Sequence, residues 1–234
     1  MERLTPAAPA KVKRYHEARY IFATTYAKGL KVLDIACGNG YGSLILSAEA
    51  ASVTGVDPSD TPLHNADHFI RSYAEQIAFE EEFDLVVSFE TIEHTISPAH
   101  FLERIWRAAK PGGRAILSFP NDWGESRFHL HNTSGSTLEL FRRYFTIEAI
   151  LGQNRSVQIA PIPIKGLPFW VENIVLVGTK KASVPDSIDL VEDAYAVIAH
   201  KQRELRYSLS WQLRRVLPLV KTALKRRGFC RGPK

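Results

Sequence analysis

The stretch VLDIACGNGYGS, from Val32 to Ser43, constrains the fold of this chain more than any other part of the sequence. It begins as an apolar run and then places glycine at positions 38, 40 and 42. This pattern predicts a buried strand that turns sharply into a helix. Glycines at such a turn let the backbone approach a ligand where side chains would collide. The stretch therefore predicts an α/β fold with a ligand at the end of an early strand.

Strands and helices alternate along most of the remaining sequence. We expect helices at 10–28, 41–50, 98–109 and 137–144, and strands at 31–36, 52–56, 83–89, 114–119, 146–151 and 173–179. The KPGG sequence at 110–113 is expected to end the third helix. This alternation predicts a Rossmann-like, doubly wound, mostly parallel sheet.

The connection after the second strand is short. Only 26 residues separate Asp57 from Asp84, and they begin with DPSDTPLHNAD, which has two prolines and little periodicity. A full helix and strand fit poorly into this length. We therefore expect a crossover shortened to a loop with one short turn.

A basic tail follows the predicted sheet. We expect a helix from Ile188 to about Arg227, with a break or kink at Pro218. Within it, SLSWQLRRVLPLVKTALKRR places Leu and Val on one stripe and Arg and Lys elsewhere. Such a helix is typical of a membrane-surface or partner-docking element, the alternative being a helix packed on its own domain or on a dimer mate. We therefore divide the chain into a core domain, 1–182, and a helical tail, 183–234.

The charge of the chain is concentrated in this tail. The formal net charge is +5, but residues 201–234 hold eleven Lys and Arg and one Glu, so the rest of the chain has a net charge of −5. This distribution argues against nucleic acid as a partner of the core. No long apolar run or apolar signal core is present, and the cysteines are Cys37 and Cys230. These features predict a cytoplasmic protein, with the tail as a peripheral contact at the inner membrane surface.

Two residues suggest what the glycine turn holds. Asp57 ends the second strand, where a carboxylate can accept both hydroxyls of a ribose. The glycine order is G-x-G-x-G, whereas a dinucleotide site prefers G-x-G-x-x-G. Asp34 lies inside the strand end, where an acid would repel a pyrophosphate but suit a cationic ligand. A nicotinamide cofactor is therefore disfavoured.

Several ordered stretches resemble class I S-adenosylmethionine-dependent methyltransferases. VLDIACGNGYGS and VTGVDPS resemble the first two motifs of that class, FDLVVSFETIEH its fourth strand and loop, and FLERIWRAAKPGGRAILSFPN the helix, turn and fifth strand that follow. The resemblance runs from about Tyr15 to Thr179 and implies a seven-stranded sheet that binds S-adenosylmethionine. By this resemblance Asp34 faces the methionine amino group and Asp57 the ribose. The further cofactor contacts that it implies are Ala36, Gly38, Gly40, Pro58, Tyr73, Ala74 and Glu90.

The adenine side departs from this family. An acidic residue followed by Ala usually follows the third strand there, and our alignment places Tyr73 and Ala74 at these positions. Tyr73 could stack on the adenine ring, or Glu75 could replace the acid. Alternatively, the change marks weakened cofactor binding.

The segment after the fourth strand predicts the reacting groups. Glu90, Glu93 and His94 lie beyond the carboxyl end of a strand, where an open α/β sheet places its chemistry. The E-x-x-E-H pattern resembles ubiquinone-biosynthesis O-methyltransferases and small-RNA 2′-O-methyltransferases, in which such residues hold a divalent ion. By this resemblance Glu90, Glu93, His94 and His131 are catalytic residues and ligands of Mg²⁺. The alternative has no metal, with Glu93 capping a helix and His94 touching cofactor or substrate.

The sequence hypothesis is thus a methyltransferase with an α/β core and a small-molecule or glycan acceptor. The stretch RYSLSWQLRRVLPLVKTAL resembles segments of bacterial surface-polysaccharide glycosyltransferases, which favours O-methylation of a sugar, glycan or lipid-linked saccharide. The alternative acceptors are a quinone-like phenol and an RNA 2′-hydroxyl. A non-catalytic scaffold that has lost cofactor affinity is an alternative of another class.

Overall fold

The computed structural model describes residues 9–59, 66–121, 134–154, 157–162 and 171–184. Its strands are β1 (Lys31–Ile35), β2 (Ser52–Asp57), β3 (His68–Arg71), β4 (Phe83–Phe89), β5 (Ala109–Pro120), β6 (Phe145–Gln153), β7 (Ile159–Pro161) and β8 (Asn173–Lys180). They form one sheet in the order β3-β2-β1-β4-β5-β8-β6-β7.

The sheet is mostly parallel. Strands β3, β2, β1, β4 and β5 are parallel neighbours, and β8 pairs antiparallel with both β5 and β6. Because β8 is reversed, its first residue lies at the same edge as the carboxyl ends of the parallel strands, and Asn173 pairs with both Pro120 and Gln153. The candidate site residues of β1, β2 and β4 lie at or just after the strand ends on this edge of the sheet.

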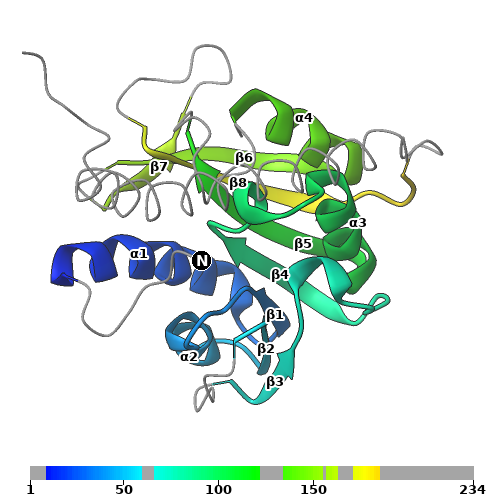
Figure 1. The fold of residues 1–234 in the computed structure, drawn as a ribbon, viewed down its shortest axis with the longest axis horizontal. Coiled ribbons are helices and arrows are strands. Elements are labelled where there is room, and N and C mark those ends of the chain that lie inside the picture. Colours follow the sequence, from blue (N-terminus) through cyan, green and yellow to red (C-terminus); the bar gives the residue numbers. More distant parts are fainter. Residues whose placement is uncertain (1–8, 60–65, 122–133, 155–156, 163–170, 185–234) are drawn as a thin grey trace, which may run out of the picture. The chain divides into compact units, whose positions relative to one another are not determined.

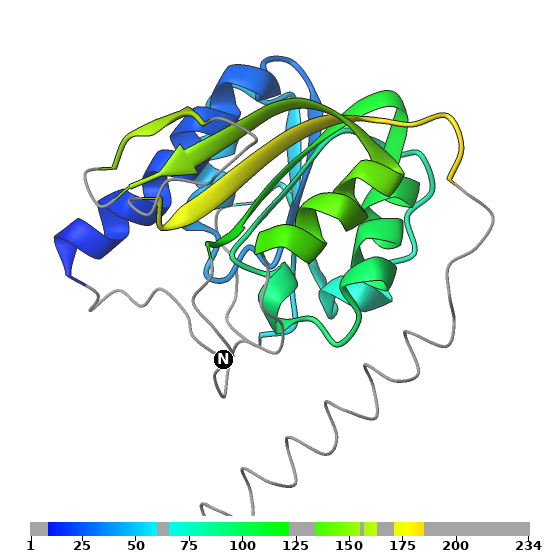
Figure 2. The ribbon, with the colours of Figure 1, turned by 90° about the horizontal axis from the view of Figure 1, so that it is seen from above.

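Helices cover both faces of the sheet (Figures 1 and 2). The helices are α1 (Ala10–Ala27), α2 (Tyr41–Ser47), α3 (Pro98–Ala108) and α4 (Ser134–Tyr144), with two 3₁₀ turns, η1 (Ala74–Gln76) and η2 (Ile92–His94). One apolar core joins α3 and α4 to the sheet through residues such as Phe101, Ile105 and Phe141. The other joins α1 and α2 to the opposite face through Tyr20, Ala23 and Leu46. The result is the three-layer arrangement expected from the alternation of strands and helices.

The predicted fold class is confirmed, and most element boundaries differ by one to three residues. The strand Phe83–Phe89 is where it was predicted, because its residues are buried apart from the half-buried Asp84 and read as a continuous apolar run. The sheet has eight strands rather than seven, because the short β7 pairs with the end of β6. A three-residue strand carries no periodicity that sequence reasoning could detect.

The prediction for residues 110–113 needs correction. Helix α3 ends at Ala108 as expected, but KPGG is part of β5 rather than a separate turn. The register jumps there, since Phe83 pairs with Ala109 whereas Leu85 pairs with Arg114. Gly112, with φ +73°, supplies the left-handed residue that such an irregularity needs.

The shortened crossover also needs a partial correction. The structure has a four-residue strand, β3, where a loop was predicted, and it pairs in parallel with β2. Strand β3 lies at the outer edge of the sheet, and three of its four residues are exposed. Hydrophobic patterning therefore gave no signal for it.

The predicted tail, 183–234, lies almost entirely outside the described residues, so its helix and the domain boundary stay predictions. None of the helices in the described part of the chain has the length and apolar character that a membrane crossing requires.

Candidate functional site

The glycine turn joins β1 to α2 through three left-handed residues. Ala36 has φ +60°, Gly38 +61° and Gly40 +78°. Backbone bonds fix the turn, with the Gly40 N–H 3.0 Å from the Cys37 carbonyl and the Cys37 N–H 3.1 Å from the Val56 carbonyl. A Cβ at Gly38 would meet no atom within 4 Å. Glycine is therefore favoured at position 38 by its left-handed backbone and not by a lack of space. The space beside it is open, as a ligand-binding turn requires.

Asp57 is tied to this turn. It is 3% exposed at the end of β2, and its Oδ2 accepts a 3.0 Å hydrogen bond from the Gly38 N–H. Its Oδ1 accepts a 2.9 Å bond from the Ser59 N–H. A carboxylate at such a strand end is the kind of group that accepts ribose hydroxyls. The structure thus brings the predicted ribose acid and the glycine turn together, as the sequence predicts.

Asp34 is fully buried below the turn. Its Oδ1 accepts from the Tyr20 hydroxyl at 3.2 Å and its Oδ2 from the Ser43 hydroxyl at 2.7 Å. Burial raises the pKa of Asp34 to about 7, against the two hydrogen bonds from Ser43 and Tyr20, and Asp57 adds to the rise. The carboxylate therefore links α1 to α2. Its predicted contact with the methionine amino group stays a prediction.

The predicted adenine side consists of η1 and the residues around it. Tyr73 is 56% exposed, and Ala74 packs against the core that includes α3. Glu75 Oε1 accepts hydrogen bonds from the Ile96 and Ser97 amides at 2.8 and 2.9 Å. Glu75 therefore ties η1 to the start of α3, and the exposed Tyr73 ring is the group free to meet a ligand. Pro58 follows β2 directly and is half-buried.

Glu90 stands at the carboxyl end of β4 with an unusual backbone. Its φ of +53° is in the left-handed region, which a residue with a side chain adopts at a cost. Its N–H donates to the Ser118 carbonyl at 3.0 Å and lies 3.2 Å from the Ser118 hydroxyl. That hydroxyl donates to Glu90 Oε1 at 2.7 Å, and the Asn173 amide donates to Oε2. Both carboxylate oxygens are held by donors from neighbouring strands.

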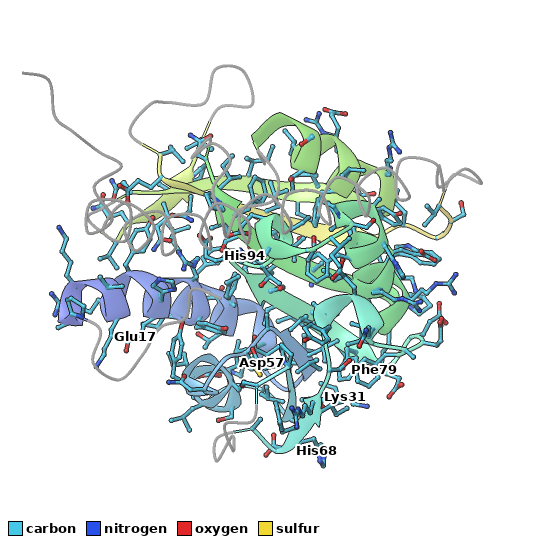
Figure 3. The ribbon with its side chains drawn as sticks, in the orientation of Figure 1. Glu17, Lys31, Asp57, His68, Phe79 and His94 are labelled. Atoms are coloured by element: carbon cyan, nitrogen blue, oxygen red, sulfur yellow. The ribbon has the colours of Figure 1, made fainter. Side chains whose placement is uncertain are left out.

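Glu93 and His94 lie in η2, directly after this strand end. Glu93 is 1% exposed, and its Oε1 is 3.9 Å from His94 Nε2, while the imidazole is 23% exposed. Figure 3 labels His94 and also Asp57 of β2. The buried Glu93 carboxylate thus lies beside the part-exposed imidazole of His94. Either His94 or Glu90 can accept a proton at this edge.

The predicted Mg²⁺ site is not supported. Among the described residues, no group of three or more His, Cys, Asp and Glu side chains is placed to hold a metal ion. Glu90 directs its carboxylate to Ser118 and Asn173, whereas the Glu93 side chain is buried. His131, the fourth predicted ligand, lies outside the described residues. As described, Glu90, Glu93 and His94 therefore do not form a divalent-ion site.

Helix α1 contributes polar side chains that sequence reasoning missed. Arg19 is 1% exposed, and its guanidinium donates to Gln153 Oε1 at 2.7 Å and contacts His16 Nδ1 at 2.9 Å. Burial and the neighbouring Arg19 lower the pKa of His16 to about 4, so His16 is neutral and accepts the hydrogen bond. Within the described part of the chain, the Arg19 Nε has no hydrogen-bond partner.

A signal for Arg19 was present in the sequence. Tyr15, Arg19, Ala23 and Ala27 recur at a spacing of four, which places a charged residue on the stripe that the helix buries. A buried guanidinium is costly unless an anion or several hydrogen bonds compensate it. A charge on a buried stripe therefore indicates a ligand or a polar network.

Comparison with known proteins supports a methyltransferase. Residues 33–117 match the family model described as "Methyltransferase domain". The chain is thus similar, in this region, to S-adenosylmethionine-dependent methyltransferases. The match covers most of β1, all of α2, β2, β3, β4 and α3, and most of β5, so it includes the glycine turn, Asp57 and Glu90.

Two kinds of relatives agree with this assignment. The chain is 40% identical over 105 residues to a ubiquinone biosynthesis O-methyltransferase of Pseudomonas aeruginosa strain LESB58, a match that covers 40% of this chain and 45% of that protein. The chain thus matches less than half the length of such relatives. A TehB-like S-adenosylmethionine-dependent methyltransferase from Corynebacterium glutamicum is 26% identical, with TM-score 0.54 over 71% of this chain and 88% of the other.

A second solved structure shares the fold alone. The N-methyltransferase NodS of Bradyrhizobium japonicum WM9, solved with S-adenosyl-L-homocysteine, is 14% identical, with TM-score 0.56 over 75% of this chain and 89% of the other. Since a methyltransferase for nitrogen has this fold, the fold does not specify the methylated atom.

Proposed function

We propose that the chain transfers a methyl group from S-adenosylmethionine to the hydroxyl oxygen of a quinone-like phenol. The contact between Asp57 and the Gly38 amide carries the cofactor part of this proposal, because it joins a ribose-binding carboxylate to an open glycine turn. The relatives named for ubiquinone biosynthesis support a phenolic acceptor over the sugar expected from the sequence.

The cofactor residues follow from the geometry of the turn and from charge. Asp57 would accept the ribose hydroxyls, and Gly38 and Gly40 would let the backbone approach the ligand. Arg19 offers a buried cation with an unused Nε–H donor, which complements the carboxylate of a methionine group. Tyr73 offers an exposed ring for the adenine.

When bound, S-adenosylmethionine supplies the methyl group on a positively charged sulfur, and transfer breaks that carbon–sulfur bond as a carbon–oxygen bond forms. The residues of this chain must remove the proton from the acceptor hydroxyl. Glu90 is the better placed base, because donors from β5 and β8 fix its carboxylate in position. His94, whose Nε2 faces the buried Glu93, is the second proton acceptor at this edge.

The acidity of the acceptor fits a base without metal. A phenol loses its proton near pH 10, as tyrosine does, whereas a sugar hydroxyl is far less acidic. A carboxylate without a metal ion can therefore assist methylation of a phenol more readily than that of a sugar.

Transfer of labelled methyl groups tests this function. The full chain would be incubated with methyl-labelled S-adenosylmethionine and either a catechol-type phenol or a sugar acceptor, each with and without EDTA. We expect labelled phenol, with equal rates in both buffers, and no labelled sugar. Preferential labelling of the sugar, or loss of activity in EDTA, would contradict the acceptor or the metal-free mechanism, respectively.

The tail adds one proposal that rests on sequence alone. We propose that the basic amphipathic segment 208–234 brings the enzyme to anionic membrane surfaces. Co-sedimentation with anionic vesicles should depend on this segment and weaken as salt rises. Equal sedimentation of a chain that lacks residues 208–234 would contradict it.

A further inference from the structure

Two residues far from Glu90 in the sequence determine where its carboxylate lies. The amide of Asn173, the first residue of β8, donates to Glu90 Oε2, and the hydroxyl of Tyr15 in α1 donates to Asn173 Oδ1. Asn173 is 2% exposed. With the Ser118 hydroxyl on Oε1, β5 and β8 hold this side chain directly, and α1 supports it through Asn173.

The direction of these hydrogen bonds is fixed by chemistry. Burial raises the pKa of Tyr15, a change that Arg19 opposes and that Glu90 and Glu172 increase, so the phenol keeps its proton. Tyr15 donates to the Asn173 oxygen, and the Asn173 amide nitrogen faces Glu90. Glu90 therefore accepts a hydrogen bond at each carboxylate oxygen.

Tyr15 is itself anchored. Its carbonyl accepts a 2.7 Å hydrogen bond from the Gln153 amide, and the Arg19 guanidinium lies 5.2 Å from the centre of its ring. Arg19 also donates to Gln153 at 2.7 Å, which closes a set of contacts between α1 and the end of β6. The hydroxyl of Tyr15 therefore has a fixed position from which to hold Asn173.

The backbone of Glu90 shows why such support is needed. With φ at +53°, Glu90 occupies a conformation that local sequence does not favour. Strained residues persist where the surroundings determine them, and they are common at functional sites. Ser118 and Asn173 contact Glu90, and Tyr15 contacts Asn173, so these three residues stabilise the position of Glu90.

We propose that Tyr15 and Asn173 are positioning residues, which act through Glu90 to place its carboxylate for removal of the acceptor proton. This inference rests on the proposed methyl transfer. It makes α1 part of the catalytic apparatus, although α1 precedes the family motif. Neither residue need touch the acceptor for its loss to slow the reaction.

Steady-state kinetics of four variants test the proposal. Tyr15→Phe removes one hydroxyl from α1, and Tyr26→Phe, on the same helix, is its matched control, because the Tyr26 ring packs on Phe22. Asn173→Asp places a carboxylate against Glu90. Glu90→Gln is the background for a double-mutant cycle with Tyr15→Phe.

We expect Tyr15→Phe to lower kcat about three- to tenfold, as loss of one hydrogen bond does, with the affinity for S-adenosylhomocysteine unchanged. Asn173→Asp should lower kcat further, and Tyr26→Phe should not change it. In the Glu90→Gln background, Tyr15→Phe should cost nothing more, because its effect passes through Glu90.

The outcomes separate two failures. Wild-type kcat in Tyr15→Phe and Asn173→Asp, or an equal loss from Tyr15→Phe in both Glu90 backgrounds, overturns the positioning role. A wild-type chain that binds S-adenosylhomocysteine but methylates no acceptor overturns the proposed function instead. Loss of cofactor affinity in Tyr15→Phe also overturns the positioning role, since it indicates a general structural effect.

Discussion

The glycine turn after β1 and the Glu90 strand end after β4 lie at the ends of neighbouring parallel strands but are built in different ways. Each contains a non-glycine residue in the left-handed region, Ala36 at φ +60° and Glu90 at +53°. The turn is held by one backbone bond within it, from Gly40 to Cys37, and by contacts to Val56 and Asp57 at the end of the adjacent β2. The Glu90 end is held by Ser118 and Asn173, 28 and 83 residues away. One part of a site can thus be recognised from a contiguous sequence motif, whereas another part depends on contacts between residues that only the folded chain brings together.

This difference separates binding from chemistry. The turn needs only glycines and one carboxylate to accept a cofactor, so it is compatible with different acceptors. The more remote contacts fix the proposed base Glu90, and their loss should affect turnover without affecting cofactor affinity. The predictions below test that separation, beginning with the largest expected effect.

Glu90→Gln should reduce turnover most. Loss of a general base typically lowers kcat by roughly 10² to 10⁴, whereas cofactor binding at the turn should not change. Steady-state kinetics and a binding titration would give both values. Glu103→Gln, a surface residue of α3 that pairs with Arg107, is the control and should leave both unchanged. His94→Ala should cost less than Glu90→Gln, and the reverse order would make His94 the base.

Asp34 should make the turn sensitive to pH. Because its folded-state pKa is raised from 3.8 to about 7, its contribution to stability is complete below pH 4 and is lost as the pH rises through 7. The loss is at most about 4 kcal/mol, at 1.36 kcal/mol per unit of pKa. Urea unfolding at pH 4, 6 and 8 should therefore show a smaller decline in Asp34→Asn than in the wild type. If the free energy of unfolding declined equally with pH in both proteins, the pKa of Asp34 would not be raised in the folded state.

Gly42→Ala should destabilise the packing of α2 on α1. An added Cβ would lie 2.0 Å from Cζ of the Tyr20 ring, which is buried and held by Asp34. Overpacking of this kind costs about 1–3 kcal/mol, more than alanine gains in a helix. The effect should shrink in a Tyr20→Leu background, which removes the obstructing ring. If the cost is the same in both backgrounds, the clash is not its cause.

Ala36→Gly should give the smallest effect and the opposite sign. Glycine removes the left-handed strain of about 1–2 kcal/mol and loses part of this gain to the greater freedom of the unfolded chain, so we expect a net stabilisation of about 0.5–1 kcal/mol. Ala115→Gly, in the buried part of β5, is the control and should destabilise the protein. Destabilisation by both would show that Ala36 carries no strain.

The same contrast explains what the sequence could predict. The turn, Asp57 and the segment around Glu90 were predicted because each is a contiguous motif at the end of an apolar strand. The contacts of Glu90 with Asn173 and Tyr15 could not be predicted, since they depend on β8 running antiparallel beside β5 and on α1 lying over that edge. The metal-binding prediction finds no support among the described residues for a related reason. Letters at E-x-x-E-H spacing do not reveal that Glu90 is held by Ser118 and Asn173 while Glu93 is buried.

The fold shows the same limit at smaller scale. Buried strands such as β4 were located by their apolar runs, whereas β3 and β7 escaped notice as short edge strands. The KPGG residues of β5 have the composition of a turn, yet pairing on both sides of them makes them an irregularity within a strand. Tertiary pairing overrode local composition there.

Calorimetric titration of the full chain with S-adenosylhomocysteine tests the central claim most directly, since this product binds without being consumed. The account predicts saturable binding with one site per chain, and binding that is about tenfold to hundredfold weaker in Asp57→Asn, since charge-assisted bonds to the ribose are lost. NAD should give no saturable heat. No binding of S-adenosylhomocysteine by the wild type, or undiminished binding by Asp57→Asn, would contradict the assignment of the glycine turn as the cofactor site.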